Sequence, residues 1–222
     1  MRTLVPTLVI LGLCLPASAL EQRISELRFG VGTLPMPDAA QESYDAGSGS
    51  TRAGGDYDYD GNTTPGVSFR IGAAGGRLQP VGLILGLDLQ GGFGVYDLSG
   101  GNAPNQRDLT YWCLVPTLRA GLGWALSTRA HIELTPLVGY GLASTQWTDG
   151  GSTETSIGGI LTYGITATVM QNLGRGFSAG IEVGYLWSQT SVSVTNGSTN
   201  GSSSVDLDAS GPTASLLFGY GF

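Results

Sequence analysis

The last nine residues of the chain alternate between large apolar and small side chains. One face carries Ala214, Leu216, Phe218, Tyr220 and Phe222, and the other carries mostly glycine and serine. A period of two is the side-chain alternation of a β-strand. A strand that is aromatic on one face and small on the other is typical of a wall between lipid and a crowded barrel lumen. The pattern therefore predicts a membrane-spanning strand.

The same alternation recurs along the chain and predicts eight strands. We expect them at 26–33, 66–73, from 81 onward, and at 109–126, 130–146, 155–170, 177–194 and 205–222. An even number of antiparallel strands of about ten residues or more is what a bacterial barrel requires. The predicted fold class is all-β, a transmembrane eight-stranded antiparallel up-and-down β-barrel.

The connections between these strands alternate in length. Four are long, polar and rich in Gly, Ser, Asn and Asp, at 34–65, 97–108, 147–154 and 195–204. Three are short, at 74–80, 127–129 and 171–176, and each carries one arginine: Arg77, Arg129 and Arg175. Long external loops and short periplasmic turns are the expected asymmetry of such barrels. Contact of the three arginines with anionic headgroups is one interpretation, and solubility is the simpler one.

The N-terminus predicts a secretory signal. Arg2 supplies a positive charge, an apolar run covers 4–15, and an Ala-x-Ala site ends at Ala19. We expect cleavage after Ala19, which makes 1–19 the signal peptide and leaves 20–222 as one barrel domain. The apolar run is too short for a membrane-spanning helix.

Charge and cysteine content restrict the function further. Loss of 1–19 leaves nine arginines, no lysine and 17 acidic residues, a balance that argues against nucleic acid as a partner. Cys113 would then be the only cysteine, so no intramolecular disulfide is expected. We interpret Cys113 as a small residue of the lumen.

Several ionisable side chains fall on the predicted inward faces. They are Arg28, Arg70, Asp88, Arg119, His131, Glu133 and Glu182. Ionisable groups at membrane depth must pair or meet water, and eight strands leave room only for side chains. We expect an internal salt-bridge plug, with a narrow pore as the alternative.

Two prolines complicate the register of the fourth and fifth strands. A turn centred near residue 126 would place Pro116 opposite Pro136 and Arg119 opposite Glu133. Because proline removes a ladder donor, we expect either local bulges or a different register there.

Two further patterns suggest chemistry. His131 is the only histidine, but Ala130 and Ile132 flank it and no nucleophile stands beside it, so we predict no catalytic site. Asp56, Asp58 and Asp60 precede Gly61, like the start of a Ca²⁺ loop, but Val67 occupies the position of the closing glutamate. Weak Ca²⁺ binding and a plain solvated loop are both open. No other cofactor is expected.

Aromatic residues fall near the predicted strand ends: Trp112, Trp124, Tyr140, Tyr185, Trp187 and Tyr220. A girdle at the membrane interfaces explains them without a ligand.

With these features the chain resembles the small eight-stranded outer-membrane barrels: the OmpA transmembrane domain, the OmpX group and the opacity-type proteins. Its end, with Phe218, Tyr220 and Phe222, is similar to the C-terminal signal that the barrel-assembly machinery reads in that superfamily. The resemblance implies a Gram-negative-type outer membrane, reached through the periplasm. It also implies outer-membrane lipids and the assembly machinery as partners, and a monomer is expected because a closed barrel has no free edge.

We therefore expect a non-enzymatic surface protein that serves envelope structure or contact and adhesion through its external loops, with an unknown external ligand. A narrow, weakly conducting porin-like channel is the alternative. A lipid-modifying outer-membrane enzyme is a third hypothesis, but it lacks recognisable catalytic residues.

Overall fold

The computed structural model describes residues 21–35, 37–45, 54–55, 66–98, 107–149, 152–196 and 201–222. Ten strands lie in these ranges: β1 (Gln22–Leu34), β2 (Pro37–Asp45), β3 (Gly54–Gly55), β4 (Gly66–Leu78), β5 (Val81–Leu98), β6 (Arg107–Ala125), β7 (Ala130–Asp149), β8 (Ser152–Gly174), β9 (Phe177–Asn196) and β10 (Gly201–Gly221). In the part of the chain so described, no helix is long and apolar enough to cross a membrane.

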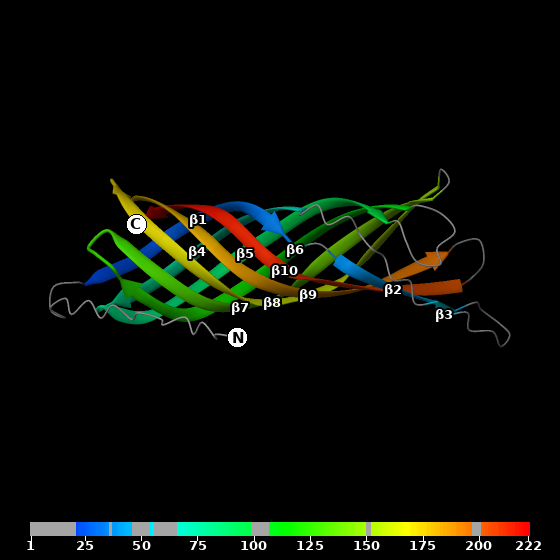
Figure 1. The fold of residues 1–222 in the computed structure, drawn as a ribbon, viewed down its shortest axis with the longest axis horizontal. Helices are drawn as coiled ribbons and strands as arrows, with labels where there is room; N and C mark the ends of the chain where they lie inside the picture. Colours follow the sequence, from blue (N-terminus) through cyan, green and yellow to red (C-terminus); the bar gives the residue numbers. More distant parts are fainter. Residues whose placement is uncertain are drawn as a thin grey trace, which may run out of the picture.

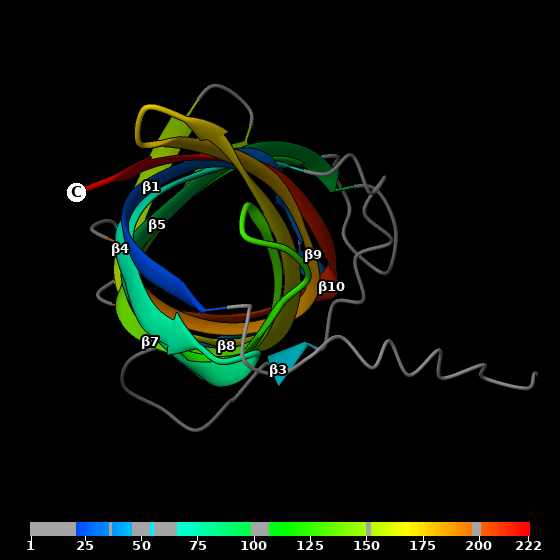
Figure 2. The same cartoon turned by 90° about the vertical axis from the view of Figure 1, so that its left-hand side faces the viewer.

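Eight of these strands close into a ring. The sheet order is β1-β4-β5-β6-β7-β8-β9-β10-β2-β3, and an additional pairing of β1 with β10 closes the barrel. Neighbouring strands in the ring are antiparallel. Figure 1 shows the tilted strands from the side, and Figure 2 looks along the barrel axis. The predicted eight-stranded up-and-down barrel is confirmed.

The alternation of the sequence matches the two faces of the wall. On β5, Leu87 is 59% exposed, whereas the next residue, Asp88, is only 5% exposed. β10 repeats the pattern at its C-terminal end, where Phe218 is exposed and Leu217 is fully buried. The outer face is therefore an apolar belt, and the inner face carries the polar and charged groups.

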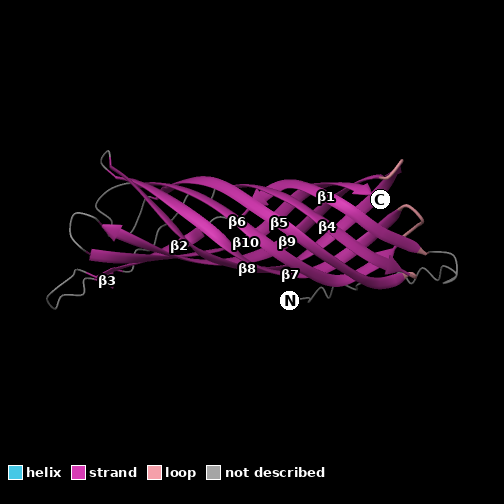
Figure 3. Cartoon of the chain, turned by 180° about the vertical axis from the view of Figure 1, so that it is seen from behind, coloured by secondary structure: helices cyan, strands magenta, loops and turns pink. Residues whose placement is uncertain are grey.

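The wall is longer than a bilayer requires. The longest strand, β8, has 23 residues, whereas a tilted spanning strand needs about 9–11. On β10 the outward face changes from Leu216 and Phe218 to Asp206 and Asp208, all of which are exposed. The loop end, which lies opposite the C-terminus in Figures 1 and 3, therefore extends beyond the hydrocarbon.

Part of the expected first external loop is a strand. β2 lies within 34–65 and continues the line of β1 along β10, because Gly32 pairs with Ser215 and Ala39 pairs with Asp208 in one register. Pro35 lies between the two strands, at the point where the sequence predicts the start of the first loop. Proline interrupts a ladder without ending the extended path of the chain, which is why composition alone suggested a loop.

Most of the remaining connections are also shorter than predicted, and the exception is the turn at 126–129, which is one residue longer. β7 ends at Asp149 and β8 begins at Ser152, well inside the expected loop 147–154. Strands similarly extend into 97–108 and 195–204, and most of the expected turn 74–80 belongs to β4. The strand boundaries were predicted from the alternation of apolar residues. The parts of the strands that lie outside the bilayer are polar and lack this alternation, so the predicted strands end too early.

The register of β6 and β7 differs from the predicted one. Thr117 lies opposite Gly139 and Arg119 lies opposite Leu137, a shift of four residues from the predicted pairing. The pairs on both sides of Pro116 and Pro136 keep one register, so the second alternative is correct and no bulge is present in this pair. The predicted opposition of Arg119 and Glu133 was wrong, because the turn centres further along the chain than residue 126.

Closure of the ring depends on the space at Gly32. A Cβ there would lie 2.8 Å from the Ser215 Cα and would also overlap the Ala214 carbonyl oxygen. We expect Gly32→Val to lower the free energy of unfolding by about 1–3 kcal/mol, because overpacking separates β1 from β10. Urea unfolding in detergent, followed by tryptophan fluorescence, measures this.

The matched control for that experiment is Gly75→Val on β4. The nearest atom to a Cβ at Gly75 is a backbone oxygen at 3.8 Å, so the added side chain meets open space. An equal loss of stability in both variants would contradict the role given to the seam between β1 and β10.

Candidate functional site: a charged lumen

The seven ionisable residues predicted for the lumen all lie in it. Six of them are buried, and Arg119 is nearly so, with 9% of its side chain exposed; none lies on the lipid-facing surface. The seven are Arg28, Arg70, Asp88, Arg119, His131, Glu133 and Glu182. They come from β1, β4, β5, β6, β7 and β9. Alternation places each inward, and the structure groups them into two clusters.

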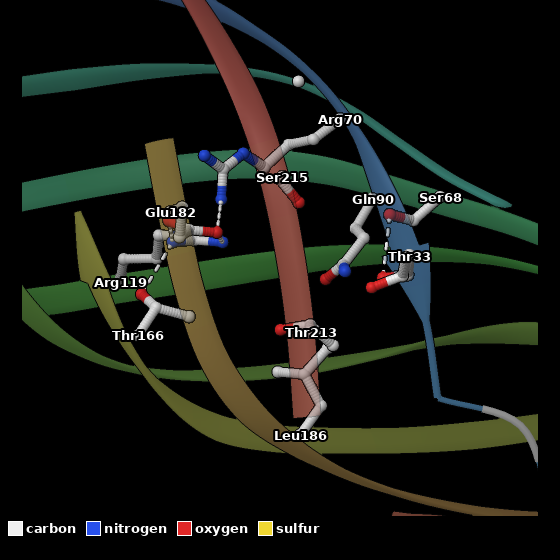
Figure 4. A pocket seen from close by; sticks show the side chains of 11 residues that line it. Thr33, Ser68, Arg70, Gln90, Arg119, Thr166, Glu182, Leu186, Thr213 and Ser215 are labelled. Carbon is white, nitrogen blue, oxygen red and sulfur yellow. Dashed lines mark hydrogen bonds and ion pairs between the residues drawn. The ribbon is translucent and has the colours of Figure 1, made fainter. Parts of the chain in front are cut away.

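The first cluster is centred on Glu182 of β9. Its carboxylate accepts hydrogen bonds from Arg70 Nη1 at 2.7 Å and from Arg119 Nη1 at 2.6 Å. The Thr168 hydroxyl donates to the same carboxylate at 2.9 Å, and Asp88 forms ion pairs with both arginines. Figure 4 shows Arg70 and Arg119 approaching Glu182 from different strands. Two arginines and two carboxylates make this cluster electrically balanced.

The second cluster lies nearer the turns. Arg28 donates to both carboxylate oxygens of Glu133, at 2.8 and 2.6 Å, and its Nε forms an ion pair with Glu26 at 3.1 Å. His131 Nε2 lies 2.8 Å from a Glu133 oxygen, and Gln22 Nε2 lies 3.1 Å from His131 Nδ1. A bidentate arginine–carboxylate pair is among the stronger side-chain interactions.

These bonds cross the barrel rather than following its wall. In the ring order, β7 is the fourth strand from β1 in either direction, so Arg28 and Glu133 bridge the full diameter. Arg70 on β4 and Arg119 on β6 each reach Glu182 on β9, three strands away. We call these bonds the cross-braces. They occupy the lumen at two levels.

Apolar layers lie on both sides of the cross-braces. At the turn end, Ile24, Leu78, Ile84 and Ala125 form a buried cluster. Toward the loop end, Tyr111, Cys113, Val115 and Leu186 are buried on the inner face. The free thiol of Cys113 is therefore inside the barrel, where the sequence placed it.

Two small cavities remain between the Glu182 cluster and the layer at the loop end. Each has a volume of about 10 Å³, which is space for about one water molecule. Gln90 and Leu186 line both, and the Gln90 Oε1 atom is buried without a protein partner. The cavities are thus suited to single bound waters and not to a continuous column of water.

His131 has no catalytic geometry in the described part of the chain. Both ring nitrogens contact side chains, Gln22 and Glu133, and the residue is only 2% exposed. No hydroxyl or thiol is hydrogen-bonded to the ring among the described residues.

The sequence missed several members of the clusters. Gln22 and Glu26 fall in or before the predicted first strand on its inward face, and their alternation with Leu27 was available as a signal. Thr166 and Thr168 lie on the inner face of β8, and their hydrogen bonds to Arg119 and Glu182 depend on the register of that strand.

Two predicted sites lie outside the described residues: the cleavage site at Ala19 and the aspartates Asp56, Asp58 and Asp60. Within the described ranges, no group of three His, Cys, Asp or Glu side chains is arranged to hold a metal ion. The calcium hypothesis therefore stays a prediction.

The outer surface is that of a membrane protein. Large exposed apolar side chains ring the barrel, for example Leu118 at 62% and Ile181 at 57% exposure. Tyr163 stacks on Trp187 with ring centroids 5.6 Å apart, and Phe177 meets Tyr220 edge-on at 5.2 Å nearer the turns. Aromatic residues at two levels of an apolar belt mark the two interfaces of a bilayer. The outer membrane is where bacterial barrels of this architecture reside.

Comparison with known proteins gives fold likeness only. No protein-family model matches the sequence, and no curated protein matches it. Among solved structures, Ail, the attachment invasion locus protein of Yersinia pestis, is 14% identical and has a TM-score of 0.39, covering 87% of this chain and 99% of its own. The outer membrane protein OprG from Pseudomonas aeruginosa is 17% identical with a TM-score of 0.41, over 91% and 95% of the two chains.

The outer membrane protease OmpT from Escherichia coli is similar at the same level. It is 10% identical with a TM-score of 0.43, over 93% of this chain and 98% of its own. These three proteins include an attachment protein and a protease. Likenesses this low carry no function from one chain to the other.

The Glu182 cluster predicts a large stability effect. Glu182→Gln leaves Arg70 and Arg119 buried with only Asp88 as a charged partner, and breaking a buried ion pair costs about 3–5 kcal/mol. We expect a loss of that size in the free energy of unfolding, measured by urea titration of the refolded barrel.

Asp208→Asn provides the control for the loss of one carboxylate charge. Asp208 is exposed on the outer face of β10, so its substitution is expected to change stability by less than about 0.5 kcal/mol. A Glu182→Gln barrel as stable as this control would mean that the cross-braces contribute nothing net.

Proposed function

We propose that this chain is a non-conducting, non-enzymatic outer-membrane barrel that anchors a contact surface formed at its loop end. The observation that carries the proposal is the set of cross-braces, which join opposite sides of the lumen at two levels. An ion path would have to pass both levels and the apolar layers at each end. Envelope structure, contact or adhesion is then the role left to the protein.

The loop end supports the contact role through its length. β8, β9 and β10 continue past the apolar belt, and β2 extends the line of β1 in the same direction. The outward residues of β9 and β10 there are polar, with Gln189, Asp206 and Asp208 exposed, while β8 carries the exposed apolar Ile157. A rigid wall that projects past the headgroups holds its loops away from the membrane surface. An external ligand of unknown chemistry would bind there, and Asp56, Asp58 and Asp60 would add weak Ca²⁺ binding.

The enzymatic alternative has little support. The sole histidine is fully occupied by Gln22 and Glu133 inside the lumen near the turns, far from the loop end. Hydrolysis at an outer leaflet or cell surface needs an accessible base beside a nucleophile. We therefore propose that the barrel carries no catalytic site.

Single-channel recording in a planar bilayer tests the closed lumen. We expect no steady conductance from the refolded wild-type barrel. The double variant Arg28→Ala/Glu133→Ala removes one cross-brace and also leaves Glu26 without its arginine, and we expect it to show brief openings or a small leak.

The control removes an arginine–glutamate ion pair from the outer surface of the barrel. Arg77 and Glu21 form an ion pair of 2.7 Å with both side chains more than half exposed. Arg77→Ala/Glu21→Ala is expected to remain silent. A steady wild-type conductance, with an ion selectivity that Arg119→Ala changes, would establish the narrow channel in place of this proposal.

Proteolysis of intact cells tests the orientation. Trypsin added outside is expected to cleave after Arg52, because the proposed orientation puts the first long connection, 34–65, outside the cell. Arg77, Arg129 and Arg175 lie at the turn end and should be protected until the outer membrane is opened. Mass spectrometry identifies the new termini, and early cleavage after Arg129 or Arg175 would reverse the proposed topology.

A further inference from the structure

Two arginines lie directly opposite each other on the lipid-facing side of the turn end. Arg23 on β1 pairs in register with Arg77 on β4. The outward positions of β1 are the odd-numbered ones, since Leu27, Phe29 and Val31 are exposed, and Arg23 continues that row. Side chains directly opposite in an antiparallel pair have Cβ atoms about 4.5–5.5 Å apart, and like charges there are destabilising.

Only one of the two positive charges is offset by an acid in the described structure. Glu21 Oε1 forms an ion pair with Arg77 Nη2 at 2.7 Å, but both groups are largely exposed, with side-chain exposures of 55% and 65%. Within the described ranges, Arg23 has no carboxylate within ion-pair distance. An exposed pair of this kind contributes little, so a net positive charge persists at this point of the rim.

The arginine pair lies at the edge of the hydrocarbon. Gly76 pairs with Ile84, which places Leu83 at the level of Arg77 on the next strand, and Leu83 is 57% exposed. Arg77 therefore has an apolar, lipid-facing neighbour on one side and Arg23 on the other. At this depth the long side chains can reach the headgroup layer while their stems stay against lipid.

The outward side chains next to the two arginines are mostly small, so the barrel surface is recessed there. One step further into the membrane, the outward pair is Ser25 and Gly75, followed by Leu27 and Ala73. A Cβ added at Gly75 would meet only a backbone oxygen at 3.8 Å, so the surface there is open. Figure 2 shows β1 and β4 side by side at this end of the barrel. The two guanidinium groups next to this recessed surface can accommodate a phospholipid headgroup, with the start of an acyl chain lying over Gly75 and Ala73.

We propose that Arg23 and Arg77 bind the phosphate of an anionic phospholipid from the inner leaflet, with its glycerol region over Ser25 and Gly75. The charge complementarity is direct, because guanidinium groups donate two parallel hydrogen bonds to phosphate. The bound phosphate also removes the repulsion between the two arginines. Glu21 competes with the phosphate for Arg77. This site does not depend on whether the barrel conducts.

Native mass spectrometry of the purified, refolded full-length mature barrel tests the site. The probes are phosphatidylglycerol and phosphatidylcholine with identical acyl chains. We expect the wild type to retain one phosphatidylglycerol about tenfold more tightly than phosphatidylcholine. Arg23→Gln/Arg77→Gln should abolish the preference, whereas Glu21→Gln should increase it severalfold.

The control variants separate a site from a general rim charge. Arg129→Gln/Arg175→Gln removes the same charge from the other turns and should leave the preference unchanged. An equal loss in both double variants, or no preference in the wild type, would overturn the proposal. Heat-dependent gel mobility shows that each variant is folded.

Two further arms distinguish a lipid from a free anion. Gly75→Leu places a large side chain on the recessed surface without a clash. It should weaken the binding of phosphatidylglycerol and leave the binding of inorganic phosphate unchanged. Inorganic phosphate at about tenfold excess over lipid should not displace the lipid. Displacement by phosphate, together with no effect of Gly75→Leu, would identify an anion site with no lipid specificity and would overturn the assignment.

Discussion

The constraint on which the whole molecule depends is that no backbone polar group can stay unpaired in hydrocarbon. A sheet meets it only by closing, since an open edge would leave a row of N–H and C=O groups without water. Here closure is made by β1 and β10, from Glu26 opposite Gly221 to Gly32 opposite Ser215. Closing the ring commits every second side chain to an interior that, at eight strands, is only wide enough for side chains. The charged residues of the inner face then pair with one another, along a strand, between neighbouring strands and across the ring.

The cross-braces follow from this narrowness. An arginine long enough to reach the far wall meets a carboxylate there, as Arg28 meets Glu133. Glycine beside a charged group leaves room for it, because a Cβ at Gly72 would lie 2.7 Å from the Asp88 Cα and would overlap the Asp88 carboxylate.

Much of the wall could be predicted from the sequence, because lipid imposes a strict period of two. That is why Asp88 could be placed on the inner face, next to the exposed Leu87. Partners across the barrel could not be predicted in the same way. Glu133 lies 105 residues from Arg28 along the chain, and the two meet only through the stagger of all the intervening strands. An error of four residues at one turn was enough to assign Glu133 to Arg119. β2 was missed for a related reason, since a strand in water has no lipid-facing row to reveal it.

The same bonds that stabilise the barrel restrict how it can act. Opening the lumen would require separating Arg28 from Glu133 and both Arg70 and Arg119 from Glu182, and a charge that stays buried without its partner costs about 3–5 kcal/mol. A ligand would have to supply that free energy through contacts it makes only with the open state. A population shift from 1:99 to 99:1 already needs about 5.5 kcal/mol of differential binding, so a gate built here would demand an exceptional ligand. On the proposed function, the interior therefore serves stability. Binding then takes place at the two surfaces that closure does not use: the polar wall beyond the belt, and the lipid-facing rim with its opposed arginines.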